Sequence, residues 1–355
     1  MVHDVLDGSA DGETGWLQRL NGFQQKETRR QAHFKWHHWP RLADGADPDQ
    51  LGETYPHILP AGFEREVFFP EHVDALLAYV EREGIHLSER VLNLRSSQVA
   101  CLNVLFPFRQ NPTWAAPVLE PLLPGIARLE QIDFEYTGPE SATQWLGEPP
   151  EGGRGRHRTS IDAAFEWLDR DGRRRLTLVE WKYTEAAFGD CGGFKSEANG
   201  QRERCKNMRV PAVEPGVDCY LEVKNGPTTT RRFWEHLADA GVNLTALAAA
   251  RGCPFRGPLN QLMRQTLLAG YLRTQGVADW VDVAVVSFQH NRTLLKVPRE
   301  MRALPGDDIL GVWNSALIGV PALRGVTVEQ LMQAVDRAGG ADPVWRAYLR
   351  ERYGI

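Results

Sequence analysis

The pattern of apolar and polar positions predicts a β-hairpin in the middle of the chain. Two runs rich in apolar, β-branched and aromatic residues, 160–168 and 176–183, flank the polar segment 169–172, which contains a glycine. If the turn is centred on this segment, the antiparallel register places Asp162 opposite Glu180. The pattern therefore sets two acidic side chains side by side on neighbouring strands.

The alternation of side chains along a strand decides what else lies on that face. Glu180 and Lys182 share one face of the second strand, whereas Val179 and Trp181 point the other way. Residues directly opposite each other in an antiparallel pair have Cβ atoms roughly 5 Å apart. One face of the hairpin is thus expected to carry Asp162, Glu180 and Lys182 together.

Other periodic patterns place further elements around the hairpin. Apolar residues at helical spacing predict helices, and alternating or continuous β-branched runs predict strands. The helices are expected at 16–42, 70–83, 96–106 (with Ser96 or Ser97 as N-cap), 230–250 and from 258 onward, and the strands at 129–136, 218–223 and 281–288. Residues 307–355 are expected to be helical, with a capping box formed by Thr327 and Gln330.

Two adjacent carboxylates repel each other, so a bare pair raises a pKa or recruits a cation. Oxygen ligands suit Mg²⁺ or Mn²⁺, which keep several waters and share the remaining positions with phosphates. Lys182 on the same face could orient a metal-bound water or neutralise charge on a phosphate. The alternative is an ordinary half-exposed hairpin whose ion pair contributes about 0–1 kcal/mol.

The arrangement of Asp162, Glu180 and Lys182 resembles the active-site signature of the PD-(D/E)XK nuclease superfamily. Four longer sequence segments resemble a bacterial family of restriction endonucleases in that superfamily. They are LRSSQVACLNVLFPF, RTSIDAAFEW, LVEWKYTE and PLNQLMRQTLLA. The resemblance covers about residues 90–290. The first motif departs from the pattern, because Ser160-Ile161-Asp162 stands where many members have Pro-Asp.

The resemblance implies an α/β fold with a restriction-endonuclease-like αβββαβ core, a mixed central sheet flanked by helices. The core would span residues 90–290 with an insertion at about 186–257, between an N-terminal helical region (1–89) and a C-terminal helical extension (291–355). It also implies a Mg²⁺- or Mn²⁺-dependent restriction-type endonuclease acting on DNA. Asp162 and Glu180 would hold the metal with the Trp181 carbonyl as a further ligand, and Lys182 would assist the attacking water.

Other polar residues are candidates to border the site. Gln98 and Asn103 match polar positions of the resembled family. Gln261 and Gln265 lie on the polar side of the helix that begins at 258. Glu130 or Glu135, on the strand at 129–136, could be a third carboxylate. Helix caps, packing hydrogen bonds or a solvated face explain such residues equally well.

Basic residues near the hairpin are candidates for nucleic-acid contact. A glycine-rich loop precedes the hairpin, and further arginines surround its turn; guanidinium groups and loop N–H groups can bind phosphates. The candidates are Arg154, Arg156, His157, Arg158, Arg173 and Arg174. A solvated loop would have the same composition.

The net charge of −5 argues against nucleic-acid binding through the charge of the whole protein, so any nucleic-acid-binding surface must be a local basic patch. No run of 18 apolar residues and no apolar leader is present, which predicts a cytoplasmic protein without a membrane partner.

Cys191, Cys205, Cys219 and Cys253 fall in the insertion. Some nucleases of the resembled superfamily carry an iron–sulfur cluster, but without a C-x-x-C motif the spacing favours small buried hydrophobes over a cluster or zinc.

Two other functions remain open. A nucleic-acid-binding or assembly protein could keep the nuclease fold without its chemistry, and a glycosidase could use Asp162 and Glu180 at the separation of retaining enzymes. The lysine and the arginine-rich loop favour a phosphate substrate. A cut in both strands by one site per chain would favour a homodimer.

Overall fold

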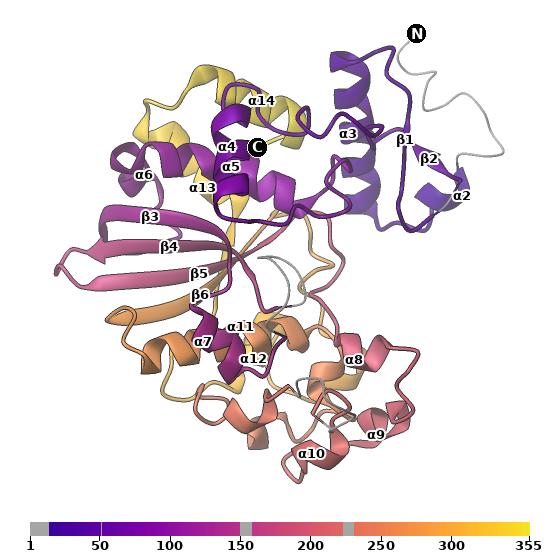
Figure 1. The fold of residues 1–355 in the computed structure, drawn as a ribbon, viewed down its shortest axis with the longest axis vertical. Coiled ribbons are helices and arrows are strands. Elements are labelled where there is room, and N and C mark those ends of the chain that lie inside the picture. The colour runs from indigo at the N-terminus through magenta and orange to yellow at the C-terminus, as the bar shows by residue number, and fades with distance from the viewer. Residues whose placement is uncertain (1–13, 51, 150–157, 223–230) are drawn as a thin grey trace.

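A five-stranded mixed sheet forms the centre of the protein (Figure 1). The computed structural model describes residues 14–50, 52–149, 158–222 and 231–355. The strands lie in the order β3 (Ile126–Tyr136), β4 (Ile161–Asp169), β5 (Arg174–Lys182), β6 (Trp280–Ser287) and β7 (Arg324–Thr327). The first three are antiparallel, and β6 and β7 continue the sheet parallel to β5.

The predicted hairpin is confirmed as β4 and β5. Ala163 pairs with Val179 in an antiparallel ladder, and the same register carried one step further sets Asp162 opposite Glu180. The register brings the two acidic residues to the open end of the hairpin, away from its turn. The two carboxylates are therefore fixed at one edge of the sheet.

The turn of the hairpin is stabilised by its own side chains. Asp169 Oδ1 accepts hydrogen bonds from the N–H groups of Asp171 (3.0 Å) and Arg173 (2.9 Å). Gly172 has φ +77°, a left-handed conformation that glycine adopts without steric cost. This local chemistry fixes the register and explains why the hairpin could be predicted from sequence.

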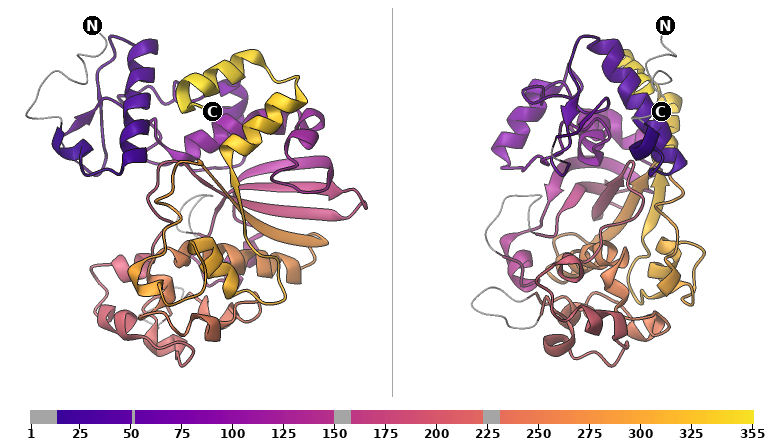
Figure 2. Two further views of the ribbon diagram at one scale, coloured as in Figure 1. Left: turned by 180° about the vertical axis from the view of Figure 1, so that it is seen from behind. Right: turned by 90° about the vertical axis from the view of Figure 1, so that its right-hand side faces the viewer.

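Helices cover both faces of the sheet (Figures 1 and 2). One face packs against α4 (Val73–Arg82), α5 (Ser97–Gln110), α6 (Pro112–Val118), α13 (Val328–Ala338) and α14 (Pro343–Tyr353). The N-terminal helix α3 (Gly22–His38) lies beside α14. Phe165, Val179, Trp181 and Val286 point into this first core.

The opposite face packs against α7 (Glu140–Trp145), α11 (Leu259–Thr274) and α12 (Ile309–Ser315). Leu178, Val283 and Val285 point into this second core, where they meet Leu267 of α11. The helices α8 (Gly192–Lys195), α9 (Arg202–Asn207) and α10 (Pro215–Asp218) extend this layer away from the sheet (Figure 1). The alternation along β5 thus separates two hydrophobic cores, as the sequence predicts.

The remaining elements are short. They are α2 (Thr14–Leu17), β1 (Gly45–Ala46), β2 (Thr54–Tyr55), and the 3₁₀ turns η1 (Trp234–His236), η2 (Leu244–Leu247), η3 (Pro254–Arg256) and η4 (Arg299–Met301). No helix in the described ranges is long and apolar enough to span a bilayer.

Most predicted elements of the core are present within a few residues of their predicted bounds. Ser96 is the N-cap of α5 and accepts a hydrogen bond from the Val99 N–H, and Thr327 and Gln330 form the predicted capping box of α13. The C-terminal region is not helical throughout, because β7 precedes α13. This short strand contains Gly325 and lacks the alternation that would reveal it.

Two elements predicted for residues 186–257 are wrong. The expected strand at 218–223 instead begins with the end of α10 and a turn, and the expected helix at 230–250 is replaced by η1 and η2. Gly241 interrupts the helical pattern with φ +84°, and a Cβ there would collide with Val320 and the Ile318 carbonyl. Tertiary contact therefore overrides helical propensity at this position.

Asn103 lies in the middle of α5 and ties this helix to its neighbours. Its side-chain N–H groups donate to the Val67 carbonyl (3.0 Å) and the Tyr353 hydroxyl (2.9 Å), and its Oδ1 accepts from the Phe69 N–H (2.8 Å). The Asn103 carbonyl loses its helical partner because residue 107 is proline, and the Trp345 indole N–H donates to it instead (2.9 Å).

Asn103→Ala should therefore destabilise the fold by at least about 2 kcal/mol, because several buried groups lose their partners together. Urea denaturation would show a lower midpoint at unchanged slope. Gln110→Ala, at the exposed end of the same helix, should stay within about 0.5 kcal/mol of the wild type. Equal midpoints for the two variants would contradict a structural role for Asn103.

Candidate active site

The carboxylates and the lysine of the hairpin lie at one edge of the sheet, where β3 and β5 end and β4 begins. Glu180 is 2% exposed, and its Oε1 lies 2.7 Å from Lys182 Nζ. Asp162 Oδ2 accepts a hydrogen bond from the Trp181 N–H (2.7 Å). The main chain of β5 thus holds the side chain of β4 beside Glu180.

Helix α11 supplies two amides to Glu180. Gln261 Nε2 donates to one carboxylate oxygen and Gln265 Nε2 donates to the other. The two glutamines are four residues apart, so they project from the same side of the helix. Together with Lys182 they fix the orientation of the Glu180 carboxylate.

Glu135, near the end of β3, brings a third carboxylate to the same edge. Its oxygens accept hydrogen bonds from Gln98 Nε2 (2.6 Å) and Ser160 Oγ (2.7 Å). Glu135 has φ +48°, and no other non-glycine residue in the described ranges has a positive φ. Such a conformation carries a cost and is maintained because the side chain is held by its neighbours.

The buried cluster raises the pKa of two of its carboxyl groups, Asp162 and Glu135. Burial is the largest cause of a pKa of Asp162 well above its usual value, and the negative charges of Glu180 and Glu135 add to it. Burial also raises the pKa of Glu135, against the lowering effect of the Ser160 and Gln98 hydrogen bonds. Burial and the charges of these carboxylates raise the pKa of the Cys101 thiol on α5.

Lys182 is the ammonium group at the centre of this negative charge. Burial opposes its charge, but Glu180, Glu185 and Asp162 raise its pKa above the usual value. One lysine therefore faces three carboxylates, those of Glu180, Glu185 and Asp162. A buried excess of negative charge is relieved either by protonation or by a cation.

The donor atoms here are oxygens, which fit Mg²⁺ or Mn²⁺ better than a soft metal. The excess negative charge also fits a divalent cation. As the side chains stand, no three His, Cys, Asp or Glu residues among those described are arranged to hold an ion. Binding would therefore require Asp162 or Glu135 to rotate toward Glu180.

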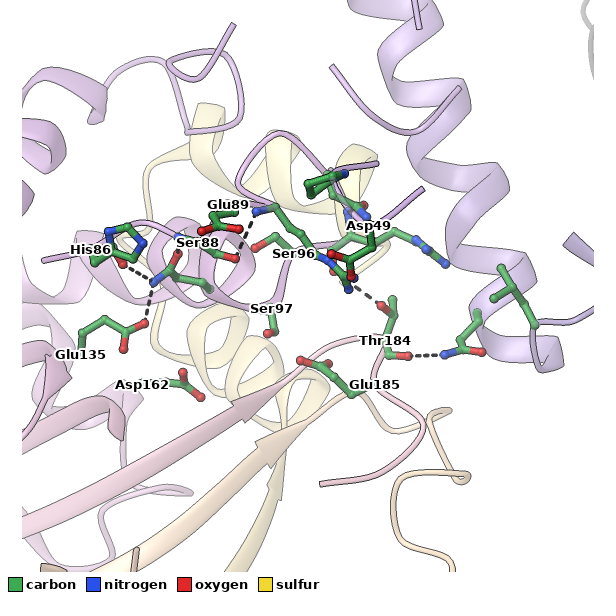
Figure 3. A pocket seen from close by; sticks show the side chains of 17 residues that line it. Asp49, His86, Ser88, Glu89, Ser96, Ser97, Glu135, Asp162, Thr184 and Glu185 are labelled. Atoms are coloured by element: carbon green, nitrogen blue, oxygen red, sulfur yellow. Dashed lines mark hydrogen bonds and ion pairs between the residues drawn. The ribbon is translucent and has the colours of Figure 1, made fainter. Parts of the chain in front are cut away.

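A cavity of about 690 Å³ leads to this edge from outside (Figure 3). Asp162 and Glu135 lie near each other on one side, and Ser97 at the start of α5 lies across from Asp162. Its volume is within the range of pockets that bind small ligands or part of a larger one. Asp162 and Glu135 are thus accessible to a substrate that enters between the sheet and the N-terminal region.

Residues at the mouth of this cavity were not predicted as site residues. They are Glu185, His86 and Arg95, together with Thr184 and Gln24. Glu185 follows Lys182 by three residues and lies beyond the end of β5, so strand alternation could not place it. Arg95 is partly buried and donates from Nη1 to the Thr28 hydroxyl (2.9 Å).

The structure does not bring every candidate to this edge. Gln98, Glu135, Gln261 and Gln265 contact the carboxylate cluster, either as members of it or as hydrogen-bond donors. Asn103 instead forms the packing contacts within the first core described above. Glu130 is exposed and paired with Arg128. Of the two glutamates considered for a third carboxylate, Glu135 occupies that position.

The basic candidates are dispersed. Arg154, Arg156 and His157 lie outside the described residues. Arg158 pairs with Glu140 (3.0 Å) and donates to the Pro149 carbonyl (3.2 Å).

Arg173 and Arg174 are exposed at the turn end of the hairpin. Six residues of strand separate Arg174 from Glu180, about 20 Å at the usual rise per residue. These two arginines therefore cannot contact the same phosphate as the carboxylates.

The mixed sheet with helices on both faces defines an α/β protein compatible with a restriction-endonuclease-like fold. A family model described as restriction endonuclease associating with ARP matches residues 27–354, and the chain belongs to this family. This confirms the resemblance to a restriction endonuclease family. A search of curated proteins and a search of solved structures each found no match to the chain.

The raised pKa of Asp162 predicts how stability depends on pH without divalent ions. As pH rises above about 4, the unfolded chain loses this proton first, so the free energy of unfolding falls as pH rises through the folded pKa. Asp162→Asn removes this pH-dependent decrease in the free energy of unfolding. At pH 7–8 the variant should melt about 2–4 °C higher than the wild type, and the difference should disappear near pH 4.

Thermal melting in EDTA across this pH range measures the effect. Asp171→Asn makes the same substitution on the exposed turn of the same hairpin and should melt like the wild type at every pH. A lower melting temperature for Asp162→Asn at pH 8 would contradict the proposed charge excess.

Proposed function

We propose that the protein is a Mg²⁺-dependent restriction-type endonuclease that hydrolyses phosphodiester bonds of DNA. The observation that carries the proposal is the convergence of Asp162, Glu180, Glu135 and Lys182 beside a cavity that Asp162 and Glu135 line. Membership in a restriction endonuclease family supports DNA as the substrate. The same geometry suits Mn²⁺ in place of Mg²⁺.

The order of elements supports a PD-(D/E)XK core. Apart from the short helices α6 and α7, which precede and follow β3, the order is α5, then β3, β4 and β5, and after the insertion α11 and β6. The acidic and basic residues of the signature lie on the second and third of these strands. We assign the core to residues 90–290, the insertion to about 186–257, and the flanking regions to 1–89 and 291–355.

In this proposal Asp162 and Glu180 hold the metal ion, with the Trp181 carbonyl as a further ligand. A bound divalent ion lowers the pKa of its water and stabilises charge on the phosphoryl oxygens. Glu135, which the hydrogen bonds from Gln98 and Ser160 orient, is the third carboxylate.

The other residues position these groups. Gln261 and Gln265 keep the Glu180 carboxylate oriented, because both donate N–H groups to it. Lys182 is charged at neutral pH and lies beside Glu180, where it can orient the attacking water or neutralise the phosphate. All three side chains contact Glu180 directly.

Cleavage assays test the proposal. Wild type, Asp162→Asn and Lys182→Met would be incubated with supercoiled plasmid and with labelled single-stranded DNA and RNA. Each reaction would contain Mg²⁺, Mn²⁺ or EDTA. We expect metal-dependent cleavage by the wild type, and a loss of at least about 100-fold in both variants. Nicked and linear plasmid products distinguish cuts in one strand from cuts in both.

Two substitutions away from the site are controls, Asp171→Asn on the hairpin turn and Lys296→Met on an exposed loop. Both should cleave like the wild type. If the wild type cleaves no substrate but all variants shift DNA equally, the protein is a binding or assembly module. Equal cleavage by wild type and Asp162→Asn would place the chemistry elsewhere.

A second test concerns the amides of α11. Gln261→Leu and Gln265→Leu should raise the Mg²⁺ concentration for half-maximal cleavage by about 10–100-fold, because residues that orient a metal ligand typically contribute that much affinity. The maximal rate at saturating Mg²⁺ should change less.

Gln275→Leu, at the exposed end of the same helix, is the matched control for this test. An unchanged Mg²⁺ dependence in both site variants would show that the amides do not orient a ligand.

A further inference from the structure

The four cysteines of the insertion meet in space although they are far apart in sequence. Cys191, Cys205, Cys219 and Cys253 all line one small cavity of about 20 Å³ beneath α11. Cys205 and Cys253 are buried, and the other two are half-buried. The fifth cysteine, Cys101, is on α5 in the other hydrophobic core. The fold therefore gathers every cysteine of the insertion and excludes the remaining one.

Main-chain hydrogen bonds hold the segments that carry these cysteines. The Cys253 N–H donates to the Cys205 carbonyl (2.7 Å), and the Cys191 N–H donates to the Arg256 carbonyl (3.3 Å). These bonds join three segments of the insertion directly beside the thiols. The cluster is thus a feature of the backbone and does not depend on long side chains.

Two glycines allow the close approach of these segments. Gly252 has φ +80°, and a Cβ there would lie 2.8 Å from the Cys205 carbonyl oxygen and closer still to that of Lys206. A Cβ on Gly193 would lie 2.6 Å from the Leu221 side chain. Either side chain would push one cysteine-bearing segment away from another.

Main-chain N–H groups lie close to three of the sulfur atoms and lower the pKa of those thiols. They are the N–H groups of Phe194 and Gly193 for Cys191, of Leu221 for Cys219 and of Phe255 for Cys253. The Asn199 side chain approaches Cys205. Neutral thiols are weak acceptors, whereas N–H donors commonly surround the sulfurs of metal-bound thiolates.

The environment of the thiols disfavours their ionised form. Burial is the largest cause that raises the pKa of Cys219 to about 12, and it also raises the pKa of Cys191 and Cys205. The thiols lie close enough for Cys219, Cys191 and Cys205 each to raise the pKa of Cys253. A cation among them would remove both penalties at once.

We propose that Cys191, Cys205, Cys219 and Cys253 form a four-thiolate site for one soft metal ion, with Zn²⁺ as the ion. Four thiolates around one ion is a usual tetrahedral zinc site. A cavity of about 20 Å³ has room for one ion. As described, no three of these side chains are arranged to hold an ion, so the thiols must turn inward to close the site.

The site explains how an insertion with few regular elements keeps its shape. Its helices have four to six residues or are single 3₁₀ turns, which supply little stability on their own. Asn260 and Met263 of α11 line the same cavity, on either side of Gln261 in sequence. The metal would therefore fix the insertion against α11, a structural role that does not rest on the proposed nuclease activity.

Metal content of the full-length protein tests the proposal. Elemental analysis should find about one zinc per chain in the wild type and in Cys101→Ser, and at least a tenfold loss in Cys219→Ser and Cys253→Ser. Anaerobic titration of metal-stripped wild type with Co²⁺ should give the intense thiolate-to-metal absorption of a tetrahedral site, saturating at one equivalent. Removal of zinc should lower the melting temperature of the wild type.

The titration keeps the proposal falsifiable if the cysteine variants fold poorly, because it uses wild-type protein. A wild type that contains no metal and gives no thiolate absorption with Co²⁺ would overturn the site. Several irons per chain with visible sulfide absorption would overturn the single-ion assignment. Equal zinc loss in Cys101→Ser would overturn the choice of ligands.

Discussion

An excess of buried negative charge at one edge of the sheet is the constraint on which the site depends. Glu180, Asp162 and Glu135 converge there, and Lys182 is the ammonium group among them. Such an arrangement costs folding free energy, which the hydrophobic cores on the two faces of the sheet offset. The amides of α11 and Gln98 of α5 hold the charged groups in place, so both helical layers contribute to one site.

The sequence was most informative where structure depends on local chemistry. The turn at Asp169–Gly172 and the alternation of β4 and β5 specify the hairpin without reference to the rest of the chain, and the β-branched run of β6 is equally local. The choice between Glu130 and Glu135 could not be made this way. The pairing of β3 with β4 contains irregularities near Leu129 and Gln131, which break the simple alternation of faces.

The parts that sequence did not reveal depend on contacts between distant segments. Strand β7 exists because it pairs with β6, and the break at Gly241 exists because residues 318–320 pack against it. The cysteines of the insertion are a further example. Their spacing in the sequence argues against a metal site, whereas the fold brings them to one cavity. Helix α11 lies between the two sites, with Gln261 facing Glu180 and its sequence neighbours lining the cysteine cavity.

The central claim is that the carboxylate cluster binds a divalent cation. Isothermal titration of Mg²⁺ and Mn²⁺ in two buffers of different ionisation enthalpy measures it directly, because the buffer dependence counts released protons. We expect saturable binding with a proton release that grows as the pH is lowered, since the raised pKa of Asp162 and Glu135 leaves protons for the metal to displace. Binding should be lost in Asp162→Asn. No saturable binding, or the same binding in that variant, would contradict it.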